Sequence, residues 1–285
     1  MCADLLRQTP ERKTDSGHLK SGISTPKGAW VPVDRTLRHR YEMKYVISES
    51  KAAAIARFIE PYLDLDHYSK LQPHGYYPIV SLYLDSDNLQ LCIESLRGKL
   101  KRFKLRVRSY SDEANYPRFF EIKRRANVVI IKSRARVRTQ DVPALLSGRY
   151  IPPIQNYKAD VDVIKQFQLY MKSINARPKV LIRYLRRAYE GNMDNRVRIT
   201  FDRQLAYRVS SDPEVLLTGR SWQHHPVTLR CVILEVKFTG RYPAWLGRMA
   251  EYFDLHQRSM SKYANSLVRA CESRFYAPKV PIQMY

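Results

Sequence analysis

Cysteine and glycine are both scarce in this sequence, and their scarcity removes several classes of site. The 285 residues include four cysteines, which lie far apart and form no CxxC pair. This spacing excludes a zinc ribbon and a disulfide scaffold and is typical of a reducing compartment. Among ten glycines there is no GxxxxGK[ST] and no GxGxxG, and the chain also lacks GxSxG and HExxH. Any phosphate ligand must therefore be held by side-chain cations instead of a glycine-rich loop.

Long apolar runs are also missing. The longest stretch without Asp, Glu, Lys or Arg covers residues 71–84, and its 14 residues are interrupted by Pro73, Gly75 and Pro78. Such a stretch is too short and too broken to span a bilayer. The first residues contain no continuous apolar segment of the kind that a secretory signal needs. We therefore expect a soluble, cytoplasmic protein.

Acidic residues are few relative to basic ones. The chain has 50 lysines and arginines against 27 aspartates and glutamates, a formal net charge of +23. Because this excess repels itself in a compact fold unless anions neutralise it, a polyanionic partner is indicated. Hydrophobic residues make up 44% of the chain, which suffices for a core of normal size. Most of the 20 tyrosines fall at core spacing and no aromatic-basic RNA motif occurs, so no specific nucleic-acid partner is expected.

The chain is predicted to consist of a leader, one domain and a short tail. Residues 1–36 lack sustained periodicity and are expected to form a flexible basic leader, followed by the domain at 37–276 and the tail at 277–285. Strands are predicted at 40–47, 79–85, 102–110, 118–125, 128–138, 180–189, 196–201, 204–208 and 231–238. Helices are predicted from an N-cap at Ser48 to about Pro61 and at 88–96, 159–174, 244–253 and 260–274, with a helical turn from Asp141. Because strands and helices do not alternate strictly, an α+β fold on an antiparallel sheet is predicted.

Charged and apolar residues alternate along these strands. Residues two apart share a strand face, so Lys104, Arg106 and Arg108 point one way and apolar side chains the other. Residues 97–138 hold 15 basic residues against three acidic ones, whereas a merely solvated face mixes signs because like charges across a ladder destabilise it. The amphipathic helices need the apolar faces as packing partners. We therefore predict a closed, barrel-like antiparallel β tunnel with a cationic interior suited to phosphates and helices packed outside.

A few acidic residues fall on the same faces as these cations. They are Glu42, Glu121, Asp202 and Glu235. Two interpretations are open for each: an internal salt bridge that holds a nearby cation, or a hard oxygen ligand for Mg²⁺ or Mn²⁺. Glu235, which lies in an apolar run late in the chain, is the preferred metal ligand, and Glu42 and Glu121 are further candidates.

A series of short motifs resembles a known family. In chain order they are Tyr41-Glu-Met-Lys44, Tyr83-Leu-Asp85, Lys104-Leu-Arg-Val-Arg108, Phe120-Glu-Ile-Lys123, Lys132-Ser-Arg134, Tyr184-Leu-Arg186, Arg198-Ile-Thr-Phe-Asp202, Leu234-Glu-Val-Lys237 and Ser261-Lys-Tyr263. Their order resembles that of VTC-type polyphosphate polymerases, which belong to the triphosphate tunnel metalloenzyme (CYTH-like) superfamily. The resemblance runs from about Arg38 to Arg269. Each motif is weak alone, and their number and order make the set specific.

The resemblance implies an antiparallel β tunnel that transfers the γ-phosphate of ATP to a growing polyphosphate chain and releases ADP. It also implies a divalent cofactor, Mn²⁺ or Mg²⁺, bound by Glu235. Together with the strand pattern, it implies catalytic roles for Lys44, Arg186, Arg198 and Lys262. Phosphate or nucleotide binding is expected for Arg97, Lys104, Arg106, Arg108, Lys123, Lys132, Arg134 and Lys237. The expected ligands are ATP, ADP and inorganic polyphosphate.

One departure from the family pattern narrows this expectation. The first strand of the wider superfamily often carries two glutamates before its lysine, whereas here Arg40 precedes a single Glu42. The departure favours a polymerase over a two-metal tripolyphosphatase. A triphosphatase of the same fold and a non-catalytic polyphosphate-binding module stay open as alternatives. The residues through Arg40 include eight basic and four acidic ones, which would suit contact with an anionic inner membrane face or a membrane-protein partner.

Overall fold

The computed structural model describes residues 40–127, 129–154, 157–191, 197–274 and 276–277. The chain divides into two units, Met1–Arg35 and Thr36–Tyr285, and all described residues belong to the second. The predicted leader, residues 1–36, lies outside the described residues, as does the predicted tail beyond residue 277.

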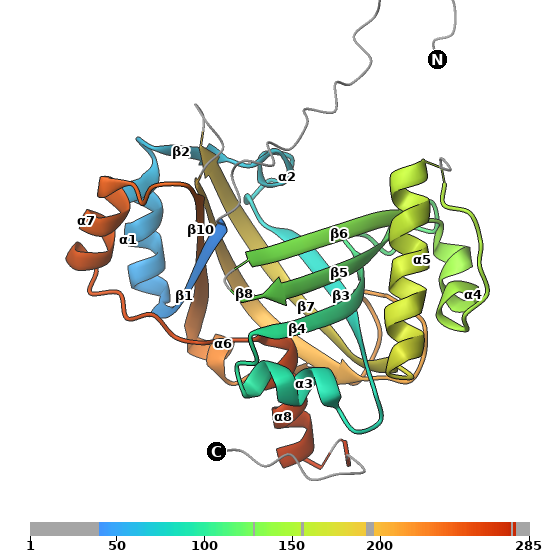
Figure 1. Ribbon diagram of the computed structural model, residues 1–285. Helices are drawn as coiled ribbons and strands as arrows, with labels where there is room; N and C mark the ends of the chain where they lie inside the picture. The colour runs from blue at the N-terminus through green and yellow to red at the C-terminus, as the bar shows by residue number, and fades with distance from the viewer. Residues whose placement is uncertain (1–39, 128, 155–156, 192–196, 275, 278–285) are drawn as a thin grey trace, which may run out of the picture. The chain divides into compact units, whose positions relative to one another are not determined.

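A single antiparallel sheet organises the second unit (Figure 1). Its order is β1-β10-β8-β7-β3-β4-β5-β6, with β2 paired to β7 and β9 paired to β8. The strands are β1 Arg40–Ser48, β2 Leu63–Leu65, β3 Tyr77–Asp85, β4 Lys101–Ser109, β5 Arg118–Ala126, β6 Val129–Val137, β7 Arg177–Gly191, β8 Val197–Val209, β9 Gln223–His224 and β10 Cys231–Thr239. The α+β class and the antiparallel sheet predicted from the sequence are confirmed.

The sheet is not closed by backbone hydrogen bonds. Its path ends at β1 on one side and at β6 on the other, and within the described residues these two edge strands do not pair. The closed barrel predicted from the sequence is therefore not found. A side-chain ion pair joins the two halves instead, because Lys123 Nζ on β5 lies 2.9 Å from Glu42 Oε2 on β1. The sheet thus curves far enough to bring β5 opposite β1 but stays open, and the face that carries these two residues is called the concave face below.

Helices pack against both faces of the sheet. They are α1 Glu49–Ile59, α2 His67–Lys70, α3 Gln90–Leu96, α4 Val142–Leu146, α5 Lys158–Ser173, α6 Val227–Arg230, α7 Ala244–Tyr252 and α8 Lys262–Glu272, with a 3-10 turn at Thr139–Asp141. The predicted N-cap is present, since the Ser48 hydroxyl accepts a hydrogen bond from Lys51 N at 3.2 Å. No helix in this described part of the chain is both long enough and apolar enough to cross a membrane.

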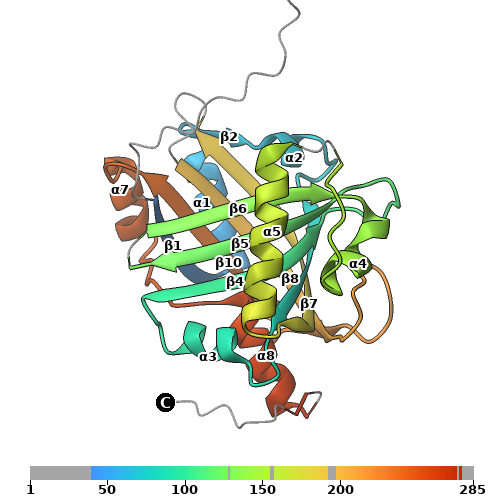
Figure 2. The same cartoon turned by 45° about the vertical axis from the view of Figure 1, so that its right-hand side comes forward.

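The convex face of the sheet is apolar and covered by helices. Phe167 of α5 meets Phe120 of β5 edge to face, with ring centroids 4.8 Å apart and both side chains buried. On the other half of the sheet, Ile55 of α1 and Leu246 of α7 are buried in one cluster with Val236 of β10. Figure 2 shows α5 lying across β4, β5 and β6. The apolar strand faces therefore have the helix partners that their pattern requires.

Helix α8 is the exception to the predicted outer position of the helices. Its Tyr263 and Leu267 are buried in a cluster with Tyr83 of β3 and Tyr184 of β7, which lie on the concave face. The Tyr263 hydroxyl also donates to Asp85 Oδ2 at 2.5 Å. The last helix therefore lies against the inside of the curved sheet and contributes side chains to it.

Strand β8 differs most from its prediction. The two short strands expected at 196–201 and 204–208 form one strand of 13 residues. Gln204 has a φ of 52°, and the register between β7 and β8 shifts between Arg183 and Leu185. A bulge of this kind changes which face the following residues occupy, so the apolar pattern breaks while the strand continues. The short elements β2, α2, β9 and α6 are found in addition to the predicted ones.

Replacing Phe167 with alanine should lower the free energy of unfolding by about 3–5 kcal/mol, because the truncation leaves a cavity beside Phe120. Leu169 lies on the same helix with 69% of its surface exposed, and Leu169→Ala should change the same quantity by less than about 0.5 kcal/mol. Urea unfolding of both variants measures the difference. Equal losses in the two variants would show that α5 does not pack through this face.

Candidate functional site

Cations from seven strands and one helix gather on the concave face. Cross-strand partners share a face, and the register places Lys44 opposite Glu235, and Lys123 opposite both Lys104 and Lys132. Those among them that the sequence analysis selected are Lys44, Lys104, Arg106, Arg108, Lys123, Lys132, Arg134, Arg186, Arg198, Lys237 and Lys262. These are eleven of the twelve cations that the sequence selected. The twelfth, Arg97, is exposed at the C-cap of α3 and belongs to none of these strand rows.

Glu121 of β5 holds four of these cations together. Its carboxylate lies 2.6 Å from Arg106 Nε, 2.8 Å from Lys132 Nζ, 2.5 Å from Arg134 Nη2 and 3.9 Å from Arg108 Nε. Burial alone would raise the pKa of Glu121, but the surrounding cations hold it well below its usual value. Both carboxylate oxygens of Glu121 are in contact with cations, and metal ligation by Glu121 stays a prediction.

Asp202 of β8 forms a second such centre. Arg186 of β7 donates from Nε and Nη2 to the two carboxylate oxygens, at 2.7 and 2.8 Å. Lys262 Nζ, from the first turn of α8, lies 2.6 Å from Asp202 Oδ2. Burial opposes ionisation of Asp202, yet these two cations keep its pKa below the ordinary value. The aspartate therefore fixes Lys262 of α8 beside the cations of the sheet.

Two glutamates from adjacent strands share one lysine. Lys44 Nζ lies 2.9 Å from Glu42 Oε1 and 3.7 Å from Glu235 Oε1. Lys123 adds a contact of 2.9 Å to Glu42, and Lys237 adds one of 3.0 Å to Glu235. Burial raises the pKa of Glu235, but Lys237 and Lys44 bring it well below its usual value, so the group is ionised.

The Glu42 and Glu235 pair is the part of the concave face whose chemistry fits a divalent metal ion. Magnesium and similar ions prefer oxygen ligands and are often bound by one or two carboxylates together with substrate phosphates. The described residues contain no group of three or more His, Cys, Asp or Glu suited to hold a metal ion. A metal at this pair would therefore need oxygen atoms from a bound phosphate as well.

The concave face is more accessible on one side than on the other. Arg108 and Arg186 expose only 7% and 10% of their side chains, whereas Lys123 and Lys132 expose 35% and 44%. Since Lys132 lies on the edge strand β6, a ligand has access to the cations from that edge. Arg108 and Arg186 lie deeper, where water screens their charge less.

Arg198 is bound by acids that the sequence analysis did not select. Its Nη2 lies 2.5 Å from Asp66 Oδ2, and its Nη1 lies 2.8 Å from Glu190 Oε2. Asp66 is buried at the N-cap of α2, where its Oδ1 accepts from Ser69 N at 2.8 Å. Aspartate is a preferred N-cap residue, but nothing in the local sequence links Asp66 to Arg198. The predicted catalytic role of Arg198 stays a prediction.

Lys104 is held by a hydroxyl instead of a carboxylate. Its Nζ donates to Ser261 Oγ at 2.8 Å, just before α8 begins. Burial lowers the pKa of Lys104, and the nearby charges of Lys44 and Lys123 lower it further, to about 7. A bound anion would favour the charged form and raise this pKa.

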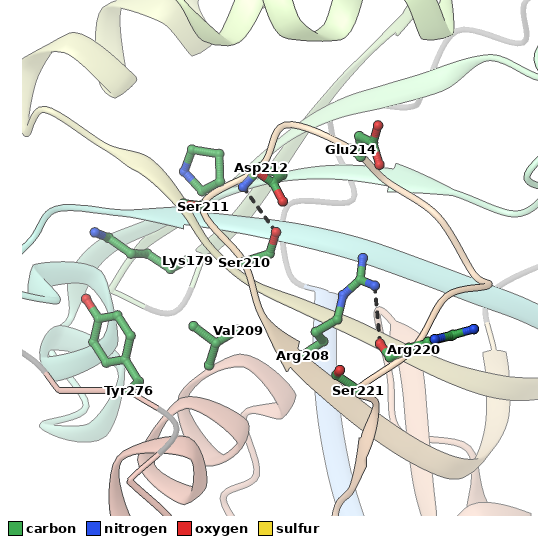
Figure 3. Close-up of a pocket in the computed structure, with 11 residues that line it drawn as sticks. Lys179, Arg208, Val209, Ser210, Ser211, Asp212, Glu214, Arg220, Ser221 and Tyr276 are labelled. Atoms are coloured by element: carbon green, nitrogen blue, oxygen red, sulfur yellow. Dashed lines mark hydrogen bonds between the residues drawn. The ribbon is translucent and has the colours of Figure 1, made fainter.

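A separate pocket of about 610 Å³ lies where β7 begins and β8 ends (Figure 3). Lys179, Arg208 and Arg220 line it together with Asp212 and Glu214. Among the described residues that line it there is no member of the predicted site. Because its cations and carboxylates are nearly balanced in number, it shows no strong preference for a polyanion.

The fold and the site together define an α+β domain in which a curved antiparallel sheet carries rows of cations on its concave face and helices cover its apolar convex face. A model of the VTC domain family matches residues 39–270, and the chain belongs to that family. This confirms the resemblance seen in the sequence motifs.

Two solved structures show a more distant similarity. A "putative adenylate cyclase" from Bacillus halodurans is 13% identical, with a TM-score of 0.44 over 79% of this chain and 94% of that one. The PH1819 protein from Pyrococcus horikoshii OT3 is 12% identical, with a TM-score of 0.38 over 80% and 99% of the two chains. A search of curated proteins finds no match.

Replacing Lys104 with methionine should stabilise the protein in the absence of ligand. Because its folded-state pKa is about 7, below that of an unfolded lysine, charging Lys104 opposes folding at pH 7 and below. Stability therefore rises as the pH increases above 7, and Lys104→Met should remove this dependence. We expect a Tm higher by roughly 2–6 °C at pH 6, with the gain fading toward pH 10.

Thermal unfolding of Lys104→Met across this pH range provides the measurement. Lys172→Met is the control, because Lys172 is exposed in the last turn of α5. A variant that is less stable than the original at pH 6 would show that Lys104 is not a destabilising charge.

Proposed function

We propose that the protein is a polyphosphate polymerase that transfers the γ-phosphate of ATP to the end of a polyphosphate chain and releases ADP. The observation that carries this proposal is the excess of positive charge on the concave face. Ten of these eleven cations contact six carboxylates and the eleventh, Lys104, donates to Ser261, so the set has a formal excess of five positive charges. The carboxylates are Glu42, Asp66, Glu121, Glu190, Asp202 and Glu235. A chain of phosphates would neutralise this excess.

The types of cation and their placement favour phosphate over other anions. Arginine presents several N–H groups in one plane and can bind phosphate oxygens in pairs. Arg106 and Arg108 lie two residues apart on one strand, with Arg186 on the same face of the sheet. Lys123 and Lys132 are more accessible, and there they would meet an incoming chain. Membership of the VTC domain family supports the same assignment.

The proposed transfer needs no nucleophile from the protein. A terminal oxygen of the acceptor chain attacks the γ-phosphorus of ATP and forms a new P–O bond. The bond between the γ-phosphorus and the oxygen bridging to the β-phosphate breaks, and ADP leaves with that electron pair. Such transfer depends on alignment and on neutralisation of charge. In this proposal Arg106, Arg108, Arg186 and Lys262 hold the nucleotide phosphates, and Lys44 and Lys123 hold the transferred group and the acceptor.

Glu42 and Glu235 are the residues proposed to hold the divalent metal ion. When bound there, Mn²⁺ or Mg²⁺ would supply positive charge beside the phosphate oxygens. Lys44 and Lys237 each lie within 4 Å of Glu235 and keep its carboxylate ionised without a metal. A cytoplasmic location and a membrane-protein partner stay predictions from the sequence.

Incubation of the full chain with ATP and Mn²⁺ tests the reaction itself. A polymerase should produce ADP and phosphate chains long enough to resolve on a gel. Release of orthophosphate without chains would identify a triphosphatase instead. Polyphosphate binding that weakens steeply with salt, with no ADP formed, would identify a binding module.

Replacing Glu235 with glutamine should lower metal-dependent ADP release by at least about a hundredfold, because the variant loses a charged oxygen ligand. Polyphosphate binding should persist or strengthen, since the change removes a negative charge from a cationic face. Steady-state kinetics and titration with polyphosphate measure the two effects. Glu251→Gln, at an exposed position of α7, should leave both unchanged. Turnover of Glu235→Gln close to the original rate would exclude Glu235 from metal binding.

A further inference from the structure

A group of aromatic rings continues the concave face beyond its cations. Tyr77 of β3, Tyr110 directly after β4 and Phe119 of β5 extend the rows that carry the cations. Tyr68 of α2 joins them, with its ring centroid 5.8 Å from that of Tyr77 and 6.0 Å from that of Tyr110. The rings of Tyr68 and Tyr110 are parallel to within 1°.

These rings differ in their exposure. Tyr77 and Phe119 are buried, whereas Tyr68 exposes 50% of its surface. Its helix is held in place by the buried Asp66, which accepts from Ser69 N at the start of α2 and from the Tyr77 hydroxyl at 3.3 Å. A half-exposed ring supported from behind by other rings is a surface on which a planar ligand can stack.

The aromatic group is in direct contact with the cations. The Arg134 guanidinium lies 4.4 Å from the Phe119 ring centroid and donates to the Tyr110 hydroxyl at 2.8 Å. The same arginine contacts Glu121, the centre of the four-cation cluster. On the other side, Arg198 contacts Asp66, the N-cap of the helix that carries Tyr68.

The order of residues along β4 gives this arrangement a direction. Tyr110, Arg108, Arg106 and Lys104 follow one another at every second position, so they share one face. At about 3.4 Å per residue, about 20 Å separates Tyr110 from Lys104. One tyrosine, two arginines and a lysine therefore follow in that order along one face of β4.

We propose that Tyr68, backed by Tyr77 and Tyr110, binds the nucleobase of a nucleoside triphosphate whose phosphates lie on the cationic face. A ligand that fits both parts needs a planar aromatic end and a polyanionic end in one molecule, and a nucleoside triphosphate has both. This inference rests on the proposed function and adds an orientation to it. The base lies at Tyr68, the triphosphate extends over the arginines, and the polyphosphate chain lies toward Lys104 and Lys123.

Calorimetric titration of the full chain with ATP and with inorganic tripolyphosphate tests this assignment. Tyr68→Ala should raise the Kd for ATP about tenfold, the effect expected from loss of one stacking contact. The Kd for tripolyphosphate, which has no base, should change less than about twofold. Tyr68→Trp should restore the affinity for ATP, because the larger ring keeps the stacking surface.

Tyr252→Ala is the matched control for this experiment. Tyr252 is 77% exposed and also packs beside other rings, Phe58 and Phe253, but it lies on α7 at the convex side. Its truncation should change neither Kd.

An unchanged Kd for ATP in Tyr68→Ala, or equal losses for both ligands, would overturn the nucleobase assignment while the proposed function stands. Failure of the unsubstituted chain to bind either ligand would overturn both.

Discussion

Repulsion among the cations of the concave face is the constraint on which the rest of the structure depends. Eleven cations from seven strands and one helix would separate if no counter-ions lay between them. Glu121, Asp202 and Glu235 supply those counter-ions from within the sheet, and each contacts cations from more than one element. The few acidic residues therefore hold the cations close together without neutralising them completely. The remaining charge is available to a ligand.

The convex face supplies the stability that such a concave face lacks. Helices α1, α4, α5 and α7 cover apolar strand faces, and burial of that surface is the main favourable term in folding. Helix α8, in contrast, packs against the concave face. The Tyr263 hydroxyl donates a hydrogen bond to Asp85 there, and Lys262 lies beside Asp202. One face of the sheet thus stabilises the fold, and the other holds like charges whose repulsion opposes it.

Alternation along the strands allowed much of this arrangement to be predicted. The residues of β4 show why, because charged and apolar side chains alternate from Arg102 to Arg108 and so identify the two faces directly. The same reasoning could not show that β1 and β6 stay unpaired, since closure depends on sheet curvature and not on the pattern of any one strand. It also divided β8 in two, because the bulge at Gln204 interrupts the alternation. No local signal linked Asp66 and Tyr68 to the concave face, since their neighbours in the fold come from distant segments.

The amino-acid sequence by itself determined which side chains share a strand face, because the two-residue period of a strand is local and needs no tertiary contact. It also determined that phosphate could be held only by side-chain cations. The tertiary structure alone decided which acid neutralises which cation, that the sheet stays open, and that α8 lies inside the curve. These features depend on contacts between segments far apart in the chain, such as Lys123 with Glu42 and Lys104 with Ser261. Their geometry exists only once the sheet has curved.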